Sequence, residues 1–68
     1  MKLNLKMPVM IPPCEYSGKR FRVAQNRAKS SGGTIYENDS NRGVFLVLTD
    51  EQRDRMYPLG LPEGTSHY

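Results

Sequence analysis

Apolar residues occupy every second position near the start of the chain, and such alternation is typical of a β-strand with one solvent-facing side. The apolar positions run from Leu3 to Ile11, with Asn4, Lys6, Pro8 and Met10 between them. Because proline has no N–H group to donate, this strand either lies at the edge of a sheet or ends near Pro8. We expect the strand Leu3–Ile11 to end at the two prolines that follow it, Pro12 and Pro13.

Two structures fit the pattern of the segment Ser17–Ser31. As a helix, it begins at Ser17, whose hydroxyl can cap the first turn, and it ends before a pair of glycines. A helical period places three apolar residues on one stripe and the charged residues around the rest; the stripe consists of Phe21, Ala24 and Ala28. As a strand, Arg20–Val23 alternates well, but the polar residues after it are then unexplained. Intrinsic propensity favours the helix.

A β-hairpin is predicted in the middle of the chain. Thr34–Glu37 contains two strong strand formers, and Val44–Leu48 is a continuous apolar run. A run without alternation is typical of a strand buried on both faces, so we place Val44–Leu48 at the centre of the sheet. The residues between the two strands, from Asn38 to Gly43, are dense in turn formers.

A second, short helix is predicted directly after this central strand. Thr49 can cap it while Gln52 reaches back to the Thr49 N–H, which is the capping-box pattern. Pro58 ends the helix. The remaining residues are rich in proline and glycine, and we expect an extended tail that is ordered only where Leu59 and Leu61 dock.

The predicted order of elements is β-α-β-β-α, which indicates a single domain of the α+β class. A strand, a helix and a parallel return strand connect right-handedly. Because Val44–Leu48 is apolar on both faces and Pro8 suits an edge, we place Leu3–Ile11 and Thr34–Glu37 on the two sides of Val44–Leu48. This three-stranded sheet is a split β-α-β, or incomplete ferredoxin-like, arrangement. The expected domain spans residues 1–58, and residues 59–68 form the tail. A small, mostly β barrel is the alternative if the basic segment is a strand.

Over Ser30–Gln52 the predicted strand order is similar to that of the propeptide-type inhibitors of subtilisin-like proteases. The likeness is one of pattern and includes no specific motif. It implies a strand order and no function.

With 68 residues the chain has room for one domain with a thin core, and such proteins often depend on a disulfide, a metal or a partner subunit. Cys14 is the only cysteine, and Cys14 and His67 fall short of the about four ligands that structural zinc needs. We therefore expect a partner protein or a homo-oligomer. The chain lacks an apolar stretch of about 20 residues and its first residues are too polar for a secretion signal, so we expect a cytoplasmic protein with no membrane span.

No group of residues in the sequence has the pattern of an active site, a cofactor site or a metal site. Cys14 has His67 as its one available histidine, and a nucleophile needs a positioned base and a third, orienting group. Asp50 and Glu51 are adjacent carboxylates, but the positive start of the second helix already accounts for both. We therefore predict that the protein is not an enzyme and that it uses no cofactor.

Positive charge is concentrated in the first half of the chain. Residues 1–30 contain seven lysines and arginines against one acid, a net charge of +6, whereas residues 31–68 contain three against six acids, a net charge of −3. A basic surface attracts acidic proteins or the phosphates of nucleic acid. The residues that we expect to form a charged contact surface are Arg20, Arg22, Arg27 and Lys29. Those that we expect as aromatic anchors of an interface are Tyr36, Tyr57 and Tyr68.

These observations favour a small protein that docks on another protein with an acidic surface and regulates, inhibits or adapts it. Compact accessory proteins of this kind are common in phages and mobile elements. Exposed edge strands offer a second route to a partner or to another copy of the chain. The alternative is a nucleic-acid-binding module that uses the same basic helix face.

Overall fold

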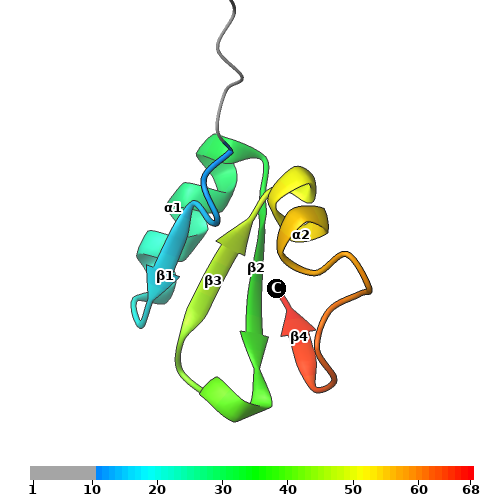
Figure 1. Cartoon of the computed structure of the whole chain (residues 1–68). Helices are drawn as coiled ribbons and strands as arrows, with labels where there is room; N and C mark the ends of the chain where they lie inside the picture. Colours follow the sequence, from blue (N-terminus) through cyan, green and yellow to red (C-terminus); the bar gives the residue numbers. More distant parts are fainter. Residues whose placement is uncertain (1–10) are drawn as a thin grey trace, which may run out of the picture.

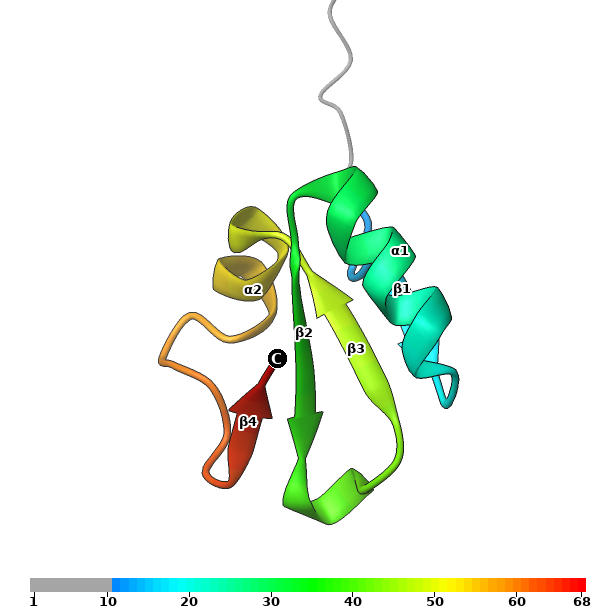
Figure 2. The same ribbon diagram turned by 180° about the vertical axis from the view of Figure 1, so that it is seen from behind.

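The chain folds around a four-stranded antiparallel sheet with one helix on each face (Figures 1 and 2). The structure is a computed structural model, and it describes residues 11–68. The elements follow one another as β1 (Tyr16–Gly18), α1 (Phe21–Ser31), β2 (Thr34–Asn38), a 3-10 helix η1 (Asp39–Asn41), β3 (Phe45–Leu48), α2 (Asp50–Met56) and β4 (Thr65–His67). The predicted α+β class is confirmed.

The strand order of the sheet is β1-β3-β2-β4, and every pair of neighbours is antiparallel. β1 and β2 therefore run parallel to each other with β3 inserted between them, which is the predicted split β-α-β arrangement. β3 and β4 repeat the arrangement, because they run parallel with β2 between them. The sheet stays open with β1 and β4 as its edges, so the alternative of a barrel is wrong.

The two helices lie on opposite faces because both crossovers are right-handed. β1 and β2 point downward in Figure 1, and the chain crosses from one to the other through α1, behind the sheet. β3 and β4 point upward, and the second crossover moves in the same direction across the sheet. Because β3 and β4 run opposite to β1 and β2, a right-handed crossover in the same direction places its helix on the other face of the sheet. α2 therefore lies in front of the sheet in Figure 1. Seen from behind, α1 is the nearer helix (Figure 2).

The first strand of the described sheet is β1, which the sequence pattern did not predict. Its residues pair with β3 in the register Tyr16–Val47, Ser17–Leu46 and Gly18–Phe45. β1 and β2 together flank β3, so the place beside β3 that was expected for Leu3–Ile11 is occupied. Residues 1–10 of that segment lie outside the described residues, and Ile11 is not part of a strand.

α1 confirms the helical interpretation of the basic segment, although the helix starts later than predicted. Ser17 is not its cap, because Ser17 belongs to β1; the helix begins at Phe21, after Arg20, whose side chain makes no capping hydrogen bond. Instead the Arg20 N–H donates to the Tyr16 hydroxyl at 3.2 Å, which fixes the turn between strand and helix. The helix ends at Gly32 as predicted, with a left-handed φ of 72°.

The sheet has four strands where the sequence predicted three, because part of the expected tail forms β4. β4 pairs with β2 in the register Tyr36–His67, Glu37–Ser66 and Asn38–Thr65. The side-chain amide of Asn38 holds the segment by donating to Thr65 Oγ1 at 2.9 Å and to the Glu63 carbonyl at 3.2 Å. The Tyr68 N–H donates to the Ile35 carbonyl at 2.9 Å, so the last residue is also attached to β2.

α1 packs on one face of the sheet through a small apolar core. The buried residues of this core are Ala24, Ile35 and Val47, with Tyr16, Ala28 and Phe45 packed around them. The predicted inward stripe is confirmed for Ala24 and Ala28, whereas Phe21 lies at the rim and is 36% exposed. Val47 and Leu48 point to opposite faces and have exposed fractions of 0% and 1%, so the central strand is buried on both sides as predicted.

A hydrogen-bond network around Gln52 joins the start of α2 to the chain before β1. Gln52 is 2% exposed, and the predicted capping box is present. The Thr49 hydroxyl accepts the Gln52 N–H at 3.2 Å, and the side-chain carbonyl of Gln52 accepts the Thr49 N–H at 3.0 Å. The Gln52 side-chain amide donates to a Glu15 carboxylate oxygen at 2.7 Å. Glu15 donates its own N–H to the Val47 carbonyl at 2.8 Å, which extends the network to β3.

The substitution Gln52→Ala removes the reciprocal cap and leaves Glu15 without its amide donor. We expect the free energy of unfolding to fall by about 2 kcal/mol, because a lost cap and a lost hydrogen bond to a charged group each cost about 1 kcal/mol or more. Urea denaturation followed by circular dichroism measures the change. Gln25→Ala is the matched control, since Gln25 is exposed on α1; it should change stability by less than about 0.5 kcal/mol. Equal losses in the two variants would contradict the role of the network.

Candidate functional site

The face of the sheet opposite α1 is only partly covered and contains a hollow of about 150 Å³. α2, a helix of seven residues, lies over one end of this face, and the chain from Tyr57 to Pro62 covers a further part. The apolar lining of the hollow consists of Tyr36, Val44, Leu46, Leu48, Tyr57, Leu61 and Pro62. Its polar lining includes Ser17, Asn38, Asn41 and Thr65.

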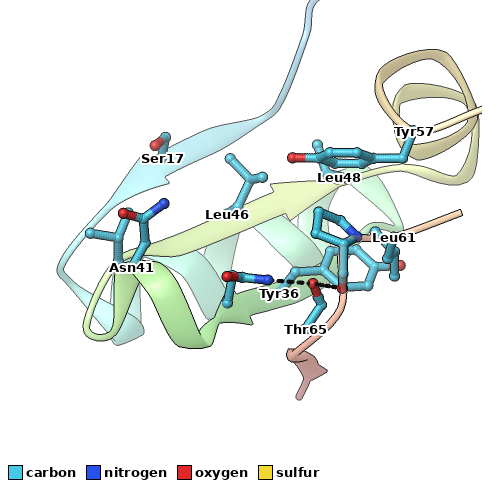
Figure 3. Close-up of a pocket in the computed structure, with 11 residues that line it drawn as sticks. Ser17, Tyr36, Asn41, Leu46, Leu48, Tyr57, Leu61 and Thr65 are labelled. Carbon is cyan, nitrogen blue, oxygen red and sulfur yellow. Dashed lines mark hydrogen bonds between the residues drawn. The ribbon is translucent and has the colours of Figure 1, made fainter.

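Strand alternation brings the floor of the hollow together. Ser17, Leu46 and Tyr36 stand opposite one another on β1, β3 and β2, so their side chains share one face. Ser17 is the smallest of the three and is exposed, which leaves the hollow open on the β1 side. Figure 3 shows Leu46 rising from β3 toward the side of the sheet on which Tyr57 lies. The hollow is therefore a space between a strand floor and a wall formed by the chain after α2.

The structure brings two of the three predicted tyrosine anchors to this hollow. Tyr36 is 6% exposed, and its hydroxyl accepts a hydrogen bond from Arg53 Nη1 at 3.4 Å, so Tyr36 belongs to the floor. Tyr57 is half-buried at the wall. Of the two leucines expected to dock, Leu61 lines the hollow and is 37% exposed, whereas Leu59 is fully exposed.

Tyr68, the third predicted anchor, lies on the α1 side of the sheet in an aromatic cluster with Phe21 and Phe45. The three rings meet edge to face, with centroid distances of 5.0 Å between Phe21 and Phe45, 5.7 Å between Phe21 and Tyr68, and 6.1 Å between Phe45 and Tyr68. Tyr68 is 58% exposed. Its hydroxyl donates to the Glu37 carboxylate, which also accepts the Gly43 N–H at 2.6 Å. The aromatic cluster thus attaches the end of the chain to the sheet while part of its ring surface stays in water.

The four basic residues predicted as a contact surface are all exposed, but they do not share one side of α1. At about 100° per residue, Arg22 and Lys29 lie about 20° apart on the helix, whereas Arg27 lies about 140° from Arg22. Arg20 precedes the helix, close to β1 in the sequence. Within residues 11–68, none of the four forms an ion pair with a carboxylate. Their charges remain available to a partner on two sides of the helix.

Cys14 and His67, the cysteine and the histidine of the chain, belong to opposite edges of the molecule's sheet, Cys14 just outside it. Cys14 is half-buried just before β1, and His67 is exposed on β4, at the opposite edge. No three Cys, His, Asp or Glu side chains of the described residues gather as a metal site. Nor does any helix in the described part of the chain have the length and apolar character needed to cross a membrane.

The sequence did not indicate the hollow as a site. The apolar run predicts Leu46 as a buried residue of the central strand, and the pattern around Ser17 predicts a helix cap. The register that sets these two residues side by side is a non-local pairing, which no local pattern encodes. The one feature of the sequence that points to the hollow is the pair Tyr57 and Leu61 beside two prolines. These two residues belong to the segment that forms the wall of the hollow.

Comparison of the chain with protein-family models, with curated proteins and with solved structures found no match.

The bond between Tyr68 and Glu37 makes stability depend on pH. The Tyr68 hydroxyl, followed by the Gly43 N–H, lowers the pKa of Glu37 below its usual value. A carboxyl whose pKa is lower in the folded state stabilises the fold above its unfolded pKa of about 4.3, and this contribution is lost as the pH falls through the folded pKa. We therefore expect the melting temperature to fall as the pH is lowered through and below the unfolded pKa of about 4.3.

The variant Tyr68→Phe keeps the aromatic cluster and removes the hydroxyl that lowers the pKa of Glu37. The acid-induced fall in melting temperature should therefore be smaller in Tyr68→Phe than in the unmodified chain. Tyr57→Phe is the matched control, because the Tyr57 hydroxyl makes no hydrogen bond within the described residues, and its profile should follow that of the unmodified chain. A Tyr68→Phe profile identical to the control would contradict the assigned role of the bond.

Proposed function

We propose that this protein is a non-enzymatic module that binds another protein and thereby regulates, inhibits or adapts it. The observation that carries the proposal is the open hollow on the sheet face opposite α1, with Leu46 in its floor and Tyr57 and Leu61 in its wall. A few large side chains that enter such pockets supply most of the binding free energy at protein interfaces. The hollow has a volume of about 150 Å³, below the roughly 300–1,000 Å³ of small-molecule sites, so it suits a side chain of a partner.

Exposed apolar residues beside the hollow support the same proposal. Met56 and Leu61 are each 37% exposed, and Leu59 is fully exposed. All three belong to the end of α2 or to the connection between α2 and β4. A partner seated on the hollow would cover part of this surface, and burial of apolar surface contributes about 25 cal/mol per Å².

The basic residues around α1 support a partner with an acidic surface. Arg20, Arg22, Arg27 and Lys29 have no carboxylate partner within residues 11–68. Charges of this kind accelerate encounter with an oppositely charged protein and discriminate against basic ones. A lone thiol and a small domain also fit an accessory protein of the cytoplasm, the compartment in which we place this chain.

The hollow is tested by a pair of leucine substitutions in one short segment. Leu61→Asp places a charge in the wall of the hollow, whereas Leu59→Asp places the same charge on a side chain that does not line it. We expect affinity purification from the source cell to recover a complex with the unmodified chain and with Leu59→Asp, and to lose it with Leu61→Asp. Thermal denaturation shows whether each variant is folded. Loss of the complex in both variants, or in neither, would refute the assignment of the hollow.

The basic residues are tested by charge reversal. We expect the paired variant Arg20→Glu with Arg27→Glu to weaken the same complex by about tenfold or more, chiefly through slower association. Both side chains are exposed and without ion pairs in the described part of the chain, so the melting temperature should stay within a few degrees. Arg55→Glu, at an exposed position of α2, is the control. Unchanged affinity in the paired variant would remove Arg20 and Arg27 from the contact surface.

A nucleic-acid-binding module is the second candidate function. The observation that favours it is the aromatic cluster, whose exposed Phe21 and Tyr68 rings meet edge to face, with Phe21 standing between Arg20 and Arg22 in the sequence. Exposed rings and basic side chains together suit base stacking and phosphate contact. Titration with single-stranded and double-stranded oligonucleotides at two salt concentrations separates the candidates. Binding that weakens steeply with salt would favour the second candidate, and no binding at low salt would exclude it.

A further inference from the structure

β1 is an edge strand with an open side. It pairs with β3 on one side, and no strand among residues 11–68 pairs with it on the other. The backbone N–H and C=O groups of such an edge can accept an extended segment as an additional strand. β1 is three residues long, so an added strand needs contacts beyond those with β1 itself.

The hollow supplies one such contact. Ser17, the middle residue of β1, lines the hollow and is exposed. A residue that pairs opposite Ser17 on an added strand has its side chain on the same face of the sheet. Because Leu46 pairs with Ser17 from the other side, an apolar side chain at that position would lie at the open end of the hollow.

Charge supplies the second contact. Lys19, Arg20 and Arg22 follow β1 directly, they are exposed, and none of them forms an ion pair within the described part of the chain. The acid nearest to β1 in sequence is Glu15, whose carboxylate accepts the Gln52 amide. The β1 edge is therefore flanked by uncompensated positive charge at its C-terminal end, which is complementary to carboxylates.

We propose that the β1 edge binds an extended segment of a partner protein, with an apolar side chain opposite Ser17 in the hollow and carboxylates against Lys19 and Arg20. This inference rests on the proposed protein-binding function and specifies its mode. Residues 1–10 of the chain do not match the site, because they carry Lys2 and Lys6 and no acidic residue. The other edge strand, β4, lacks flanking lysines and arginines and has Glu63 before it.

A displayed library of random peptides about ten residues long tests the proposal on the full chain. Peptides that bind are sequenced and synthesised, and NMR measures amide hydrogen exchange of the protein with and without them. We expect the selected peptides to combine acidic and apolar residues. We also expect them to slow the exchange of amides on the open side of β1 and to leave those of β4 unchanged. The β4 amides thus serve as the control edge within the same molecule.

Two charge variants extend the test. The paired variant Lys19→Glu with Arg20→Glu should raise the Kd of a selected peptide by about tenfold or more, and Arg55→Glu on α2 should leave it unchanged. Three outcomes would each overturn the β1-edge proposal. The selected peptides slow amide exchange elsewhere than at β1, their Kd is the same for the charge variants, or the library yields no binder.

The outcomes also separate this proposal from the function on which it rests. If Leu61→Asp abolishes the cellular complex while no selected peptide protects β1, the protein-binding function stands and the β1-edge mode is wrong. Another outcome is that a single-stranded oligonucleotide protects β1 where no peptide does, through binding that depends on Lys19 and Arg20. In that case the protein-binding function and the β1-edge mode are both wrong. Binding of a second copy at this edge, seen as protection of β1 that grows with protein concentration, would likewise overturn the partner-segment proposal.

Discussion

The fold depends on β3, a strand of four residues that is paired along both edges and buried on both faces. Val47 belongs to the core beneath α1, and its neighbour Leu48 belongs to the opposite face, where the hollow lies. One strand therefore carries both apolar layers of the molecule. Because side chains alternate along a strand, a shift of one residue in the pairing of β3 would exchange the two layers and place Leu46 in the core under α1. The register of β3 fixes the position of the core and of the hollow together.

Local sequence patterns predict the parts of the fold that have a local cause. The continuous apolar run identifies β3, a left-handed glycine at Gly32 ends α1, and the side chains of Thr49 and Gln52 cap α2. The two edge strands have no such cause. Tyr16–Gly18 shows no apolar alternation and is a strand because it pairs with β3, and Thr65–His67 is a strand because Asn38 and the β2 backbone hold it. Short edge strands of this kind are set by long-range contacts, which a single sequence does not display.

The same distinction explains how much of the candidate site the sequence predicts. Exposure of Arg22, Arg27 and Lys29 follows from their place on an amphipathic helix, and Tyr57 and Leu61 are apolar residues in a proline-rich segment. The hollow itself arises where β1, β3 and the chain after α2 meet, and these segments are distant in sequence. Tyr36 illustrates the consequence: its aromatic character suggests an exposed anchor, but the pairing of β2 with β3 turns it inward, and Arg53 binds its hydroxyl.

The open hollow follows from topology and chain length. Both crossovers are right-handed and move in the same direction across the sheet, so each helix is assigned to a different face. A single helix of eleven or seven residues cannot cover a four-stranded sheet, and residues 11–68 contain no α-helix besides α1 and α2. The side with the shorter helix keeps the larger exposed floor, and the small Ser17 extends that floor to the sheet edge. A partner strand beside β1 would add backbone hydrogen bonds at this edge and would also cover Leu46 with an apolar side chain. Both contributions would stabilise a domain whose own core is thin.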